Sequence, residues 1–521
     1  MKIAIEYAAL APVIIMLGAG VVAMLIEAFA PRAARRPLQL LLTLGAIVVS
    51  FGYVVLNFSQ TIDTTVNNGG QQFGVRELLA GGSAAADGPG WFLQGLILLI
   101  AFVGTLLFAE KGVDPQGDAF AARSSTLPGS EDERQFTSQG WFQTEIWPLF
   151  HFAVGGMLLF PISNDLLTMF VALEVLSLPL YLMAGMARRR RLLSQEAALK
   201  YFVLGAFSSA FFLFGAALVY AVAGSVTFNT IADSATNTLQ DPMLFSGVAL
   251  IAVGMLFKVG AVPFHQWTPD VYQGSPTPLT AFMGAGTKVA AFGALFRLFY
   301  VAFGDLRWEW RPMMWTVAIL TMLVGSVIAV TQSDIKRMLA YSSVAHTGFI
   351  LLALIAATPS GLSSSLIYLA AYAFTTLGVF AVVSIVRDAS GEANHLSQWA
   401  GLGKKSPLVA SIFALFLLAL AGIPLTSGFT AKFAVFTAAV DGGATPLVII
   451  AVISSAIAAF FYARVIVLMF FSSETENTAD VVVPTYFTSA AIAISAAATL
   501  ILGVIPQPLI DLAIKAGVFV R

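Results

Sequence analysis

The chain has 521 residues, of which 58% are hydrophobic and 11% are charged. A soluble domain has about 25% charged residues, so this composition excludes an ordinary water-soluble fold. The formal net charge of −1 excludes a strongly basic surface for nucleic acid. Because cysteine is absent, the chain cannot form a disulfide or hold an iron–sulfur cluster through thiolates, and any such centre must lie in another chain.

Apolar runs follow one another along most of the chain. Each is about 20 residues long, the length at which a helix crosses the hydrocarbon layer of a bilayer. The runs lack the alternation of polar and apolar residues that marks the strands of a membrane β-barrel. The sequence therefore predicts an all-α polytopic membrane protein with about fourteen transmembrane helices. We expect these helices to centre near residues 18, 48, 100, 153, 174, 210, 253, 290, 321, 347, 373, 418, 458 and 495.

The loops between the predicted helices differ in charge. Lys and Arg gather in alternate loops, most densely at residues 188–191, and such loops usually face the cytoplasm. The alternation predicts an even number of spans with the N-terminus outside. Two hydrophilic stretches, residues 59–90 and 111–142, are rich in Gly, Ser, Asp and Gln, and we expect both to be surface loops.

Four lysines lie inside the predicted helices. Lys258, Lys288 and Lys432 are flanked by apolar or small residues, and Lys200 lies near the start of a helix. A lysine at the centre of a bilayer costs about 3 kcal/mol on insertion scales, so it usually has a function. A desolvated amine also exchanges protons more readily near neutral pH. Arg297, by contrast, lies toward a helix end, where we expect its long side chain to reach the membrane surface.

Glu174 is the one acid deep inside a predicted helix. If a buried lysine lies nearby, each group favours the charged form of the other, and a change in their separation releases or takes up a proton. The alternative is a static ion pair that only fixes helix packing. Three or four buried lysines for one acid favour the first interpretation, because one static pair leaves most of the charge unpaired.

Two histidines are candidates for passing protons between lysines. His265 follows Lys258 by seven residues, which places it on the same helical face two turns away unless Pro263 bends the helix. The alternative is a histidine at a loop edge that bonds to the backbone. His346, in YSSVAHTGF, has hydroxyl groups nearby, and either proton relay or ordinary packing explains it.

A proline stands close to a buried lysine in two predicted helices, the seventh in KVGAVPFHQW and the twelfth in LAGIPLTSGFTAKF. Proline frees backbone groups, which are tolerated in a bilayer where protein or trapped water surrounds them. The recurrence indicates the weak internal symmetry of transporters built from inverted repeats. We therefore expect two broken helices beside a hydrated path.

The run FKVGAVPFHQWTPDVYQGSPTPLTAF, followed by TKVAAF, closely resembles the signature of the antiporter-like subunits of respiratory complex I, the NADH-quinone oxidoreductase. ALEVLSLPLYLMAG, SDIKRMLAYSSVAHTGF and LAGIPLTSGFTAKF agree with it, and the matches run in order from about residue 140 to 470. WTPDVYQGSPTP, the short C-terminus and Lys432 resemble the N-type chains (subunit 2) rather than the L or M type. The two long hydrophilic stretches depart from the compact N-type pattern.

The resemblance implies a fold with two inverted five-helix repeats. A three-helix segment at 1–143 precedes the first repeat at 144–303, which holds helices four to eight. The second repeat at 304–471 holds helices nine to thirteen, and 472–521 forms a last helix and tail. Helices seven and twelve are broken.

The resemblance also implies roles for individual residues. Glu174 is the family's glutamate on helix five, with Lys258 as its partner on helix seven. Lys288 is the connecting lysine and Lys432 the terminal one. Lys200 and His265 also fall on family positions.

The implied function is proton translocation coupled to quinone reduction in other subunits of a bacterial energy-transducing membrane. The chain itself binds no cofactor on this reading, and flavin, iron–sulfur clusters and quinone belong to partner subunits. M-type and K-type membrane subunits are the expected neighbours. The alternatives are the large subunit of a multi-subunit cation/proton antiporter, from which VYQGSP and Lys432 distinguish the chain, and a scaffold with relict charges.

Overall fold

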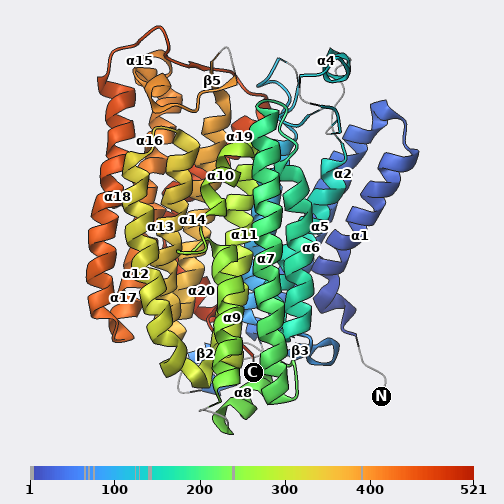
Figure 1. Ribbon diagram of the computed structural model, residues 1–521, viewed down its shortest axis with the longest axis vertical. Helices are drawn as coiled ribbons and strands as arrows, with labels where there is room; N and C mark the ends of the chain where they lie inside the picture. The colour runs from blue at the N-terminus through green and yellow to red at the C-terminus, as the bar shows by residue number, and fades with distance from the viewer. Residues whose placement is uncertain are drawn as a thin grey trace.

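The computed structural model describes the chain except for residues 1–4, 64–65, 69–70, 74–76, 116, 122, 124, 128, 139–143, 238–240, 389–390 and 521. The described part is a bundle of long helices that run roughly side by side (Figure 1). The helices are α1 (Tyr7–Phe29), α2 (Arg32–Asp63), α3 (Gly88–Phe108), α4 (Glu131–Ser138), α5 (Ile146–Leu159), α6 (Leu166–Ala184), α7 (Arg191–Ala223), α8 (Phe228–Asn237), α9 (Pro242–Val259), α10 (Trp267–Gly274), α11 (Thr277–Arg297), α12 (Arg307–Thr331), α13 (Ile335–Ala356), α14 (Pro359–Ile385), α15 (Leu402–Lys405), α16 (Pro407–Ala421), α17 (Ser427–Asp441), α18 (Thr445–Phe471), α19 (Tyr486–Val504) and α20 (Gln507–Ala516).

The predicted membrane helices are present. Among the described residues, twelve helices are long and apolar enough to cross a bilayer. The other two predicted positions, near 153 and 418, fall on shorter apolar helices, Ile146–Ile162 and Pro407–Ala421. The prediction of an all-α polytopic fold with about fourteen spans is therefore confirmed.

Both predicted breaks are also present. α9 ends at Val259 and α10 begins only at Trp267, and Gly260 closes α9 with a φ of 74°. α16 ends at Ala421, Gly422 has a φ of 84°, and α17 begins at Ser427. Glycine suits these left-handed helix ends because it has no Cβ to clash. A proline in each gap then prevents the backbone from resuming the helix at once.

The helices differ in how much of their surface is covered. α11, α13 and α14 are buried almost all round, whereas α1, α2, α18 and α19 expose large apolar side chains. α1 and α2 lie at one edge of the bundle and α18 at the opposite edge (Figure 1). A helix that is apolar all round belongs in a protein core or in lipid, so this pattern fits a bundle whose rim faces the membrane and whose centre is protein.

Short strands close the two ends of the bundle (Figure 1). At the end where α1 begins and the chain finishes lie two antiparallel hairpins. At the other end, near α15, lies a three-stranded antiparallel sheet in the order β6-β5-β7, with Arg387 opposite Glu392. The strands are β1 (Val66–Asn68), β2 (Gln71–Phe73), β3 (Glu77–Leu79), β4 (Ala84–Ala86), β5 (Val386–Asp388), β6 (Gly391–Glu392) and β7 (Asp480–Val481).

The two hydrophilic stretches are only partly surface loops. Parts of 59–90 and of 111–142 lie outside the described residues. Within the described parts, Leu79, Ala85, Asp114, Asp118 and Phe120 are buried, which the sequence analysis did not predict. Polar composition normally indicates exposure, but Asp114 and Asp118 are buried because they pair with arginines from a loop distant in the chain.

Candidate functional site

Lys258 lies in the last turn of α9 and is buried. Its Nζ donates hydrogen bonds to Ser177 Oγ at 2.6 Å and to Tyr181 OH at 3.3 Å, both on α6. The ammonium also lies 5.3 Å from the centre of the Tyr181 ring and 5.9 Å from that of Tyr201. Neutral oxygens and aromatic faces therefore surround this amine.

Glu174 lies three residues before Ser177, on the same face of α6. It is half-buried, and its Oε1 has no hydrogen-bond partner among the described residues. The structure thus brings α6 and α9 together but leaves the predicted Glu174–Lys258 pair open. Lys258 is bonded one helical turn away from the carboxylate.

Lys288 lies at the centre of the bundle on α11. Its Nζ donates to the backbone oxygen of Ser343 at 2.6 Å, to Ser343 Oγ at 2.6 Å and to Thr347 Oγ1 at 2.8 Å, all on α13. The Thr347 hydroxyl in turn donates to the backbone oxygen of Val259 at 2.7 Å. Because Val259 is the last residue of α9, this hydroxyl connects Lys288 to the first helix break, next to Lys258.

His346 is buried on α13, three residues after Ser343. Its Nδ1 lies 2.6 Å from Tyr368 OH on α14, and its Nε2 lies 3.4 Å from Tyr462 OH on α18. Tyr372 OH, on α14, donates to Ser343 Oγ at 2.8 Å. Hydroxyl groups therefore lie on both sides of the imidazole, which fits proton relay and ordinary packing equally.

Lys432 lies at the second break. Its Nζ donates to the backbone oxygens of Leu420 at 3.0 Å and Ala421 at 2.8 Å, the last residues of α16, and to Ser455 Oγ at 2.9 Å. The break leaves these carbonyls without helical partners, and a cation is favoured at a helix C-terminus. Ser455 and Tyr462 are seven residues apart on α18, so one face of this helix contacts both Lys432 and His346.

Lys200 is partly exposed on α7 and belongs to a different kind of cluster. Its Nζ lies 2.7 Å from Glu196 and 2.8 Å from Asp270 Oδ2. Asp270 Oδ1 also accepts from Arg337 at 2.7 Å. The sequence analysis missed Asp270, although an acid in the first turn of the helix after a break is favoured by the helix dipole.

His265 lies inside the first break, between α9 and α10. It does not share a helical face with Lys258, because α9 ends at Val259, so the exception that the sequence analysis made for a break at Pro263 applies. Its ring lies 6.1 Å from that of Tyr341, and its Nδ1 has no hydrogen-bond partner among the described residues.

Arg297 does not extend to the outside of the bundle, as a side chain that reaches for the membrane surface would. Its side chain is completely buried at the end of α11, and its guanidinium bonds to Asp87 Oδ1 at 2.7 Å and to the backbone oxygen of Pro161 at 2.7 Å. Asp87 also caps α3 and accepts from the backbone N–H of Val520 at 3.0 Å. This buried pair joins the start of α3, the end of α11 and the C-terminal tail.

The described part of the chain contains no group of three or more His, Asp or Glu side chains that could hold a metal ion. The buried amines and hydroxyls can donate, accept and transfer protons.

Comparisons with known proteins show the family of the chain. Residues 163–458 match the family described as NADH:quinone oxidoreductase/Mrp antiporter, TM. A protein from Rhodococcus opacus named NADH-quinone oxidoreductase subunit N is 58% identical, with 99% of this chain and 97% of that protein covered. A protein of the same name from Mycobacterium bovis is 52% identical, with 99% of each chain covered.

Solved structures show the same fold. A chain of respiratory complex I from Thermus thermophilus is 30% identical, with a TM-score of 0.74 over 97% of this chain and 100% of that one. A chain of the Mrp complex from Dietzia sp. has a TM-score of 0.79 over 98% and 97% of the two chains, but its 22% identity shows the fold alone. The chain belongs to the NADH:quinone oxidoreductase/Mrp antiporter membrane family, and within that family to the group of subunit N.

Proposed function

We propose that this chain is a membrane subunit of a proton-translocating NADH-quinone oxidoreductase and that it moves protons along Glu174, Lys258, Lys288, His346 and Lys432. One observation carries the proposal. The three buried lysines on this path donate to hydroxyl and carbonyl oxygens, whereas other buried cations of the bundle, Lys336 and Arg297, pair with carboxylates.

The difference in partners matters for proton exchange. A carboxylate 2.6 or 2.7 Å away stabilises the cation strongly where water is scarce, so the proton stays on. Hydroxyl and carbonyl partners give weaker stabilisation, and a hydroxyl can also donate to the neutral amine. The paired cations therefore suit a structural role, and the three lysines suit proton exchange.

The contacts suggest how a charge at the first helix break affects Lys432 at the second. Thr347 connects the first break to Lys288, Ser343 and Tyr372 lie between Lys288 and His346, and α18 contacts both His346 and Lys432. Like charges repel strongly in such an interior. A proton that arrives at Lys288 therefore disfavours a second positive charge on Lys258 or His346. A proton already bound to one of these neighbours is released and moves along the path.

Glu174 completes the path at the first repeat. If Lys258 leaves Ser177 and turns one helical turn along α6, it meets the Glu174 carboxylate, which favours the charged amine. When the Lys258 amine returns to Ser177, it loses the carboxylate that stabilises its charge, which favours release of its proton. The proposed path does not pass through His265 or Lys200, because His265 lies off the helix and Lys200 is held by two carboxylates.

The remaining parts of the proposal concern the surroundings. The relatives are bacterial respiratory-complex subunits, so we assign the chain to a bacterial cell membrane, beside M-type and K-type membrane subunits. Flavin, iron–sulfur clusters and quinone are assigned to the partners. The arginine-rich loop at 188–191 lies at the end of the bundle opposite to the start of α1, which supports an N-terminus outside.

The test is proton uptake driven by NADH in inverted membrane vesicles from a Lys258→Ala strain, with assembly of the complex checked in the same preparation. We expect loss of proton uptake together with slower NADH oxidation, because the Glu174 partner is gone. Lys404→Ala, at an exposed position in the short helix α15, is the control. Normal uptake and oxidation in the Lys258→Ala vesicles would refute a role for this path and favour a scaffold.

A further inference from the structure

A short segment after α3 contacts parts of the protein that are distant in sequence. We call residues 110–121, apart from residue 116, the strap. The strap runs antiparallel to the loop between α6 and α7, with hydrogen bonds from Ala121 N to the backbone oxygen of Met186 at 2.8 Å and from Arg188 N to that of Ala119 at 2.9 Å. Although its composition is polar, most of it is buried.

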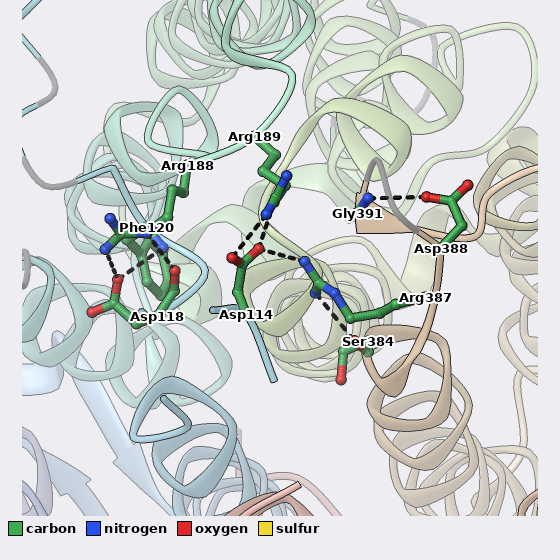
Figure 2. A network of polar contacts seen from close by, with 9 residues as sticks. All are labelled: Asp114, Asp118, Phe120, Arg188, Arg189, Ser384, Arg387, Asp388 and Gly391. Atoms are coloured by element: carbon green, nitrogen blue, oxygen red, sulfur yellow. Dashed lines mark hydrogen bonds and ion pairs between the residues drawn. The ribbon is translucent and has the colours of Figure 1, made fainter. Parts of the chain in front are cut away.

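Asp114 in the strap lies between two arginines from opposite halves of the protein (Figure 2). Its carboxylate accepts from Arg189 Nε at 2.6 Å and also from Arg387. Arg189 precedes α7 in the first predicted repeat, and Arg387 lies on β5 in the second. One buried carboxylate therefore holds together the two halves, which would otherwise present two positive charges to each other.

The rest of the strap is anchored on both sides. Asp118 Oδ1 accepts from Arg188 at 2.7 Å, and both side chains are almost fully buried. Glu110, at the start, accepts from the backbone N–H of Thr485 at 3.1 Å and from its hydroxyl at 2.8 Å, at the start of α19. These contacts anchor the strap on both sides of Asp114.

The network continues from Arg387 toward the buried lysines. Arg387 faces Glu392 across β5 and β6. Glu392 accepts from Lys336, in the first turn of α13, at 2.6 Å and from Thr277, the first residue of α11, at 2.7 Å. Burial by itself raises the pKa of the Glu392 carboxyl, but Lys336 and Thr277 bring that pKa below its ordinary value. Glu392 is therefore charged at neutral pH.

Charged side chains of both predicted repeats meet at this end of the bundle, beside the apolar packing of α11 against α14. A cavity of about 60 Å³ lies among Asp114, Arg189, Arg387, Lys336 and Glu392, which is room enough for water. The helices that begin here, α11 and α13, carry Lys288 and His346. A change in the ion pairs can therefore reach both of them.

We propose that Asp114 is a positioning residue that sets the spacing of the two repeats and so keeps α11 and α13 aligned for charge transfer. The spacing is independent of the proposed function, whereas its effect on charge transfer rests on that function. In Asp114→Asn, Arg189 and Arg387 lose their shared carboxylate and repel each other.

The first test measures the distance between the repeats. Leu192, at the start of α7, and Leu408, at the start of α16, are each 72% exposed, and the chain has no cysteine of its own. Nitroxide labels on Leu192→Cys and Leu408→Cys report their separation by pulsed electron resonance, with the complex lacking both cysteines as background. We expect Asp114→Asn to lengthen or broaden the distance distribution. An unchanged distribution overturns the proposal.

The second test measures protons taken up per NADH oxidised in vesicles. We expect Asp114→Asn to lower this ratio at least about twofold, the low end of what changes in a coupling network produce. The control is Asp480→Asn, which removes an exposed carboxylate that pairs with Lys405 at 2.6 Å in the same sheet as Arg387. A drop of equal size in the control would also overturn the proposal.

Two further variants cover a failure of Asp114→Asn to assemble. Arg387→Gln removes only the bond to the second repeat, and Arg189→Gln only the bond to the first. Each should alter the spacing, and normal spacing in an assembled Arg387→Gln complex overturns the proposal. Asp114→Asn could change the spacing while neither Asp114→Asn nor Lys258→Ala affects proton uptake. That result would confirm that Asp114 sets the spacing of the repeats and would refute the proposed function.

Discussion

At the scale of single residues, five buried cations of the described bundle differ in the chemistry of their partners. Lys258, Lys288 and Lys432 bond to neutral oxygens, and Arg297 and Lys336 bond to carboxylates. Removing one partner of a buried pair leaves an uncompensated charge, whereas a lysine that loses a hydroxyl partner can simply release its proton. The two groups should therefore respond differently to substitution.

The Asp87–Arg297 pair tests the structural group. Asp87→Asn leaves the Arg297 guanidinium in a dry site, which should destabilise the protein by about 3–5 kcal/mol. The expected result is little assembled complex, or a clearly lower melting temperature in detergent. Asp480→Asn breaks an exposed pair, which contributes about 0–1 kcal/mol, and should melt normally. Equal melting of the two variants would show that the buried pair does not stabilise the fold.

The sequence predicted these residues unevenly. Lys258, Lys288 and Lys432 were recognisable because each interrupts an apolar run. Asp87 and Asp114 were not, because their partners lie far along the chain: Arg297 is 210 residues from Asp87, and Arg387 is 273 from Asp114. A polar residue outside an apolar run gives no signal that folding will bury it.

At the scale of elements, the two helix breaks do different things. The first break ends α9 at Val259, one residue after Lys258. The backbone oxygen of Val259 accepts a hydrogen bond from the Thr347 hydroxyl. The second supplies two free carbonyls to Lys432, which lies beyond the break. The sequence predicted both breaks, because Gly and Pro disrupt helices through local geometry. It left open whether His265 stays on the helix of Lys258 or lies at a loop edge, since the length of the gap depends on packing.

Gly422 connects the second break to Lys432. Its φ of +84° suits glycine, and a Cβ there would lie 2.8 Å from Lys432 Cδ. Gly422→Ala should cost about 1–2 kcal/mol in backbone strain and also displace the amine from the Leu420 and Ala421 carbonyls, which lowers proton uptake.

Gly443→Ala is a matched control for this change. Gly443 has a φ of +75°, and no atom lies within 4 Å of its Cβ position, so the alanine brings the same strain without touching Lys432. Vesicle proton uptake in the two variants separates the effects. Equal uptake in both would show that Lys432 is unaffected by its neighbour at the break.

At the scale of the whole molecule, the proposed proton path runs through the interior of a bundle of apolar helices. The number of spans and the class of fold followed from the apolar runs alone, and the resemblance supplied the expected order of lysines. The sequence showed the hydroxyls of Ser343 and Thr347 near His346, but not that they bond to Lys288. Tyr462 was not predicted, because hydroxyls are common in helices and only packing brings α18 beside His346. The boundaries of the two repeats remain a prediction.

On the proposed path, Lys288 lies between Lys258 at the first break and His346. Lys288→Arg keeps a positive charge, but a guanidinium does not release its proton in a protein. Lys288→Ala removes the charge altogether. If Lys288 carries protons, neither variant can replace it.

The most direct measurement is therefore protons taken up per NADH oxidised in vesicles with assembled Lys288→Arg complex, beside Lys288→Ala and the unchanged protein. Proton exchange at Lys288 predicts a lower ratio in both variants. A normal ratio in Lys288→Arg would show that a fixed positive charge at this position is enough, and would contradict a path on which this lysine takes up and releases protons.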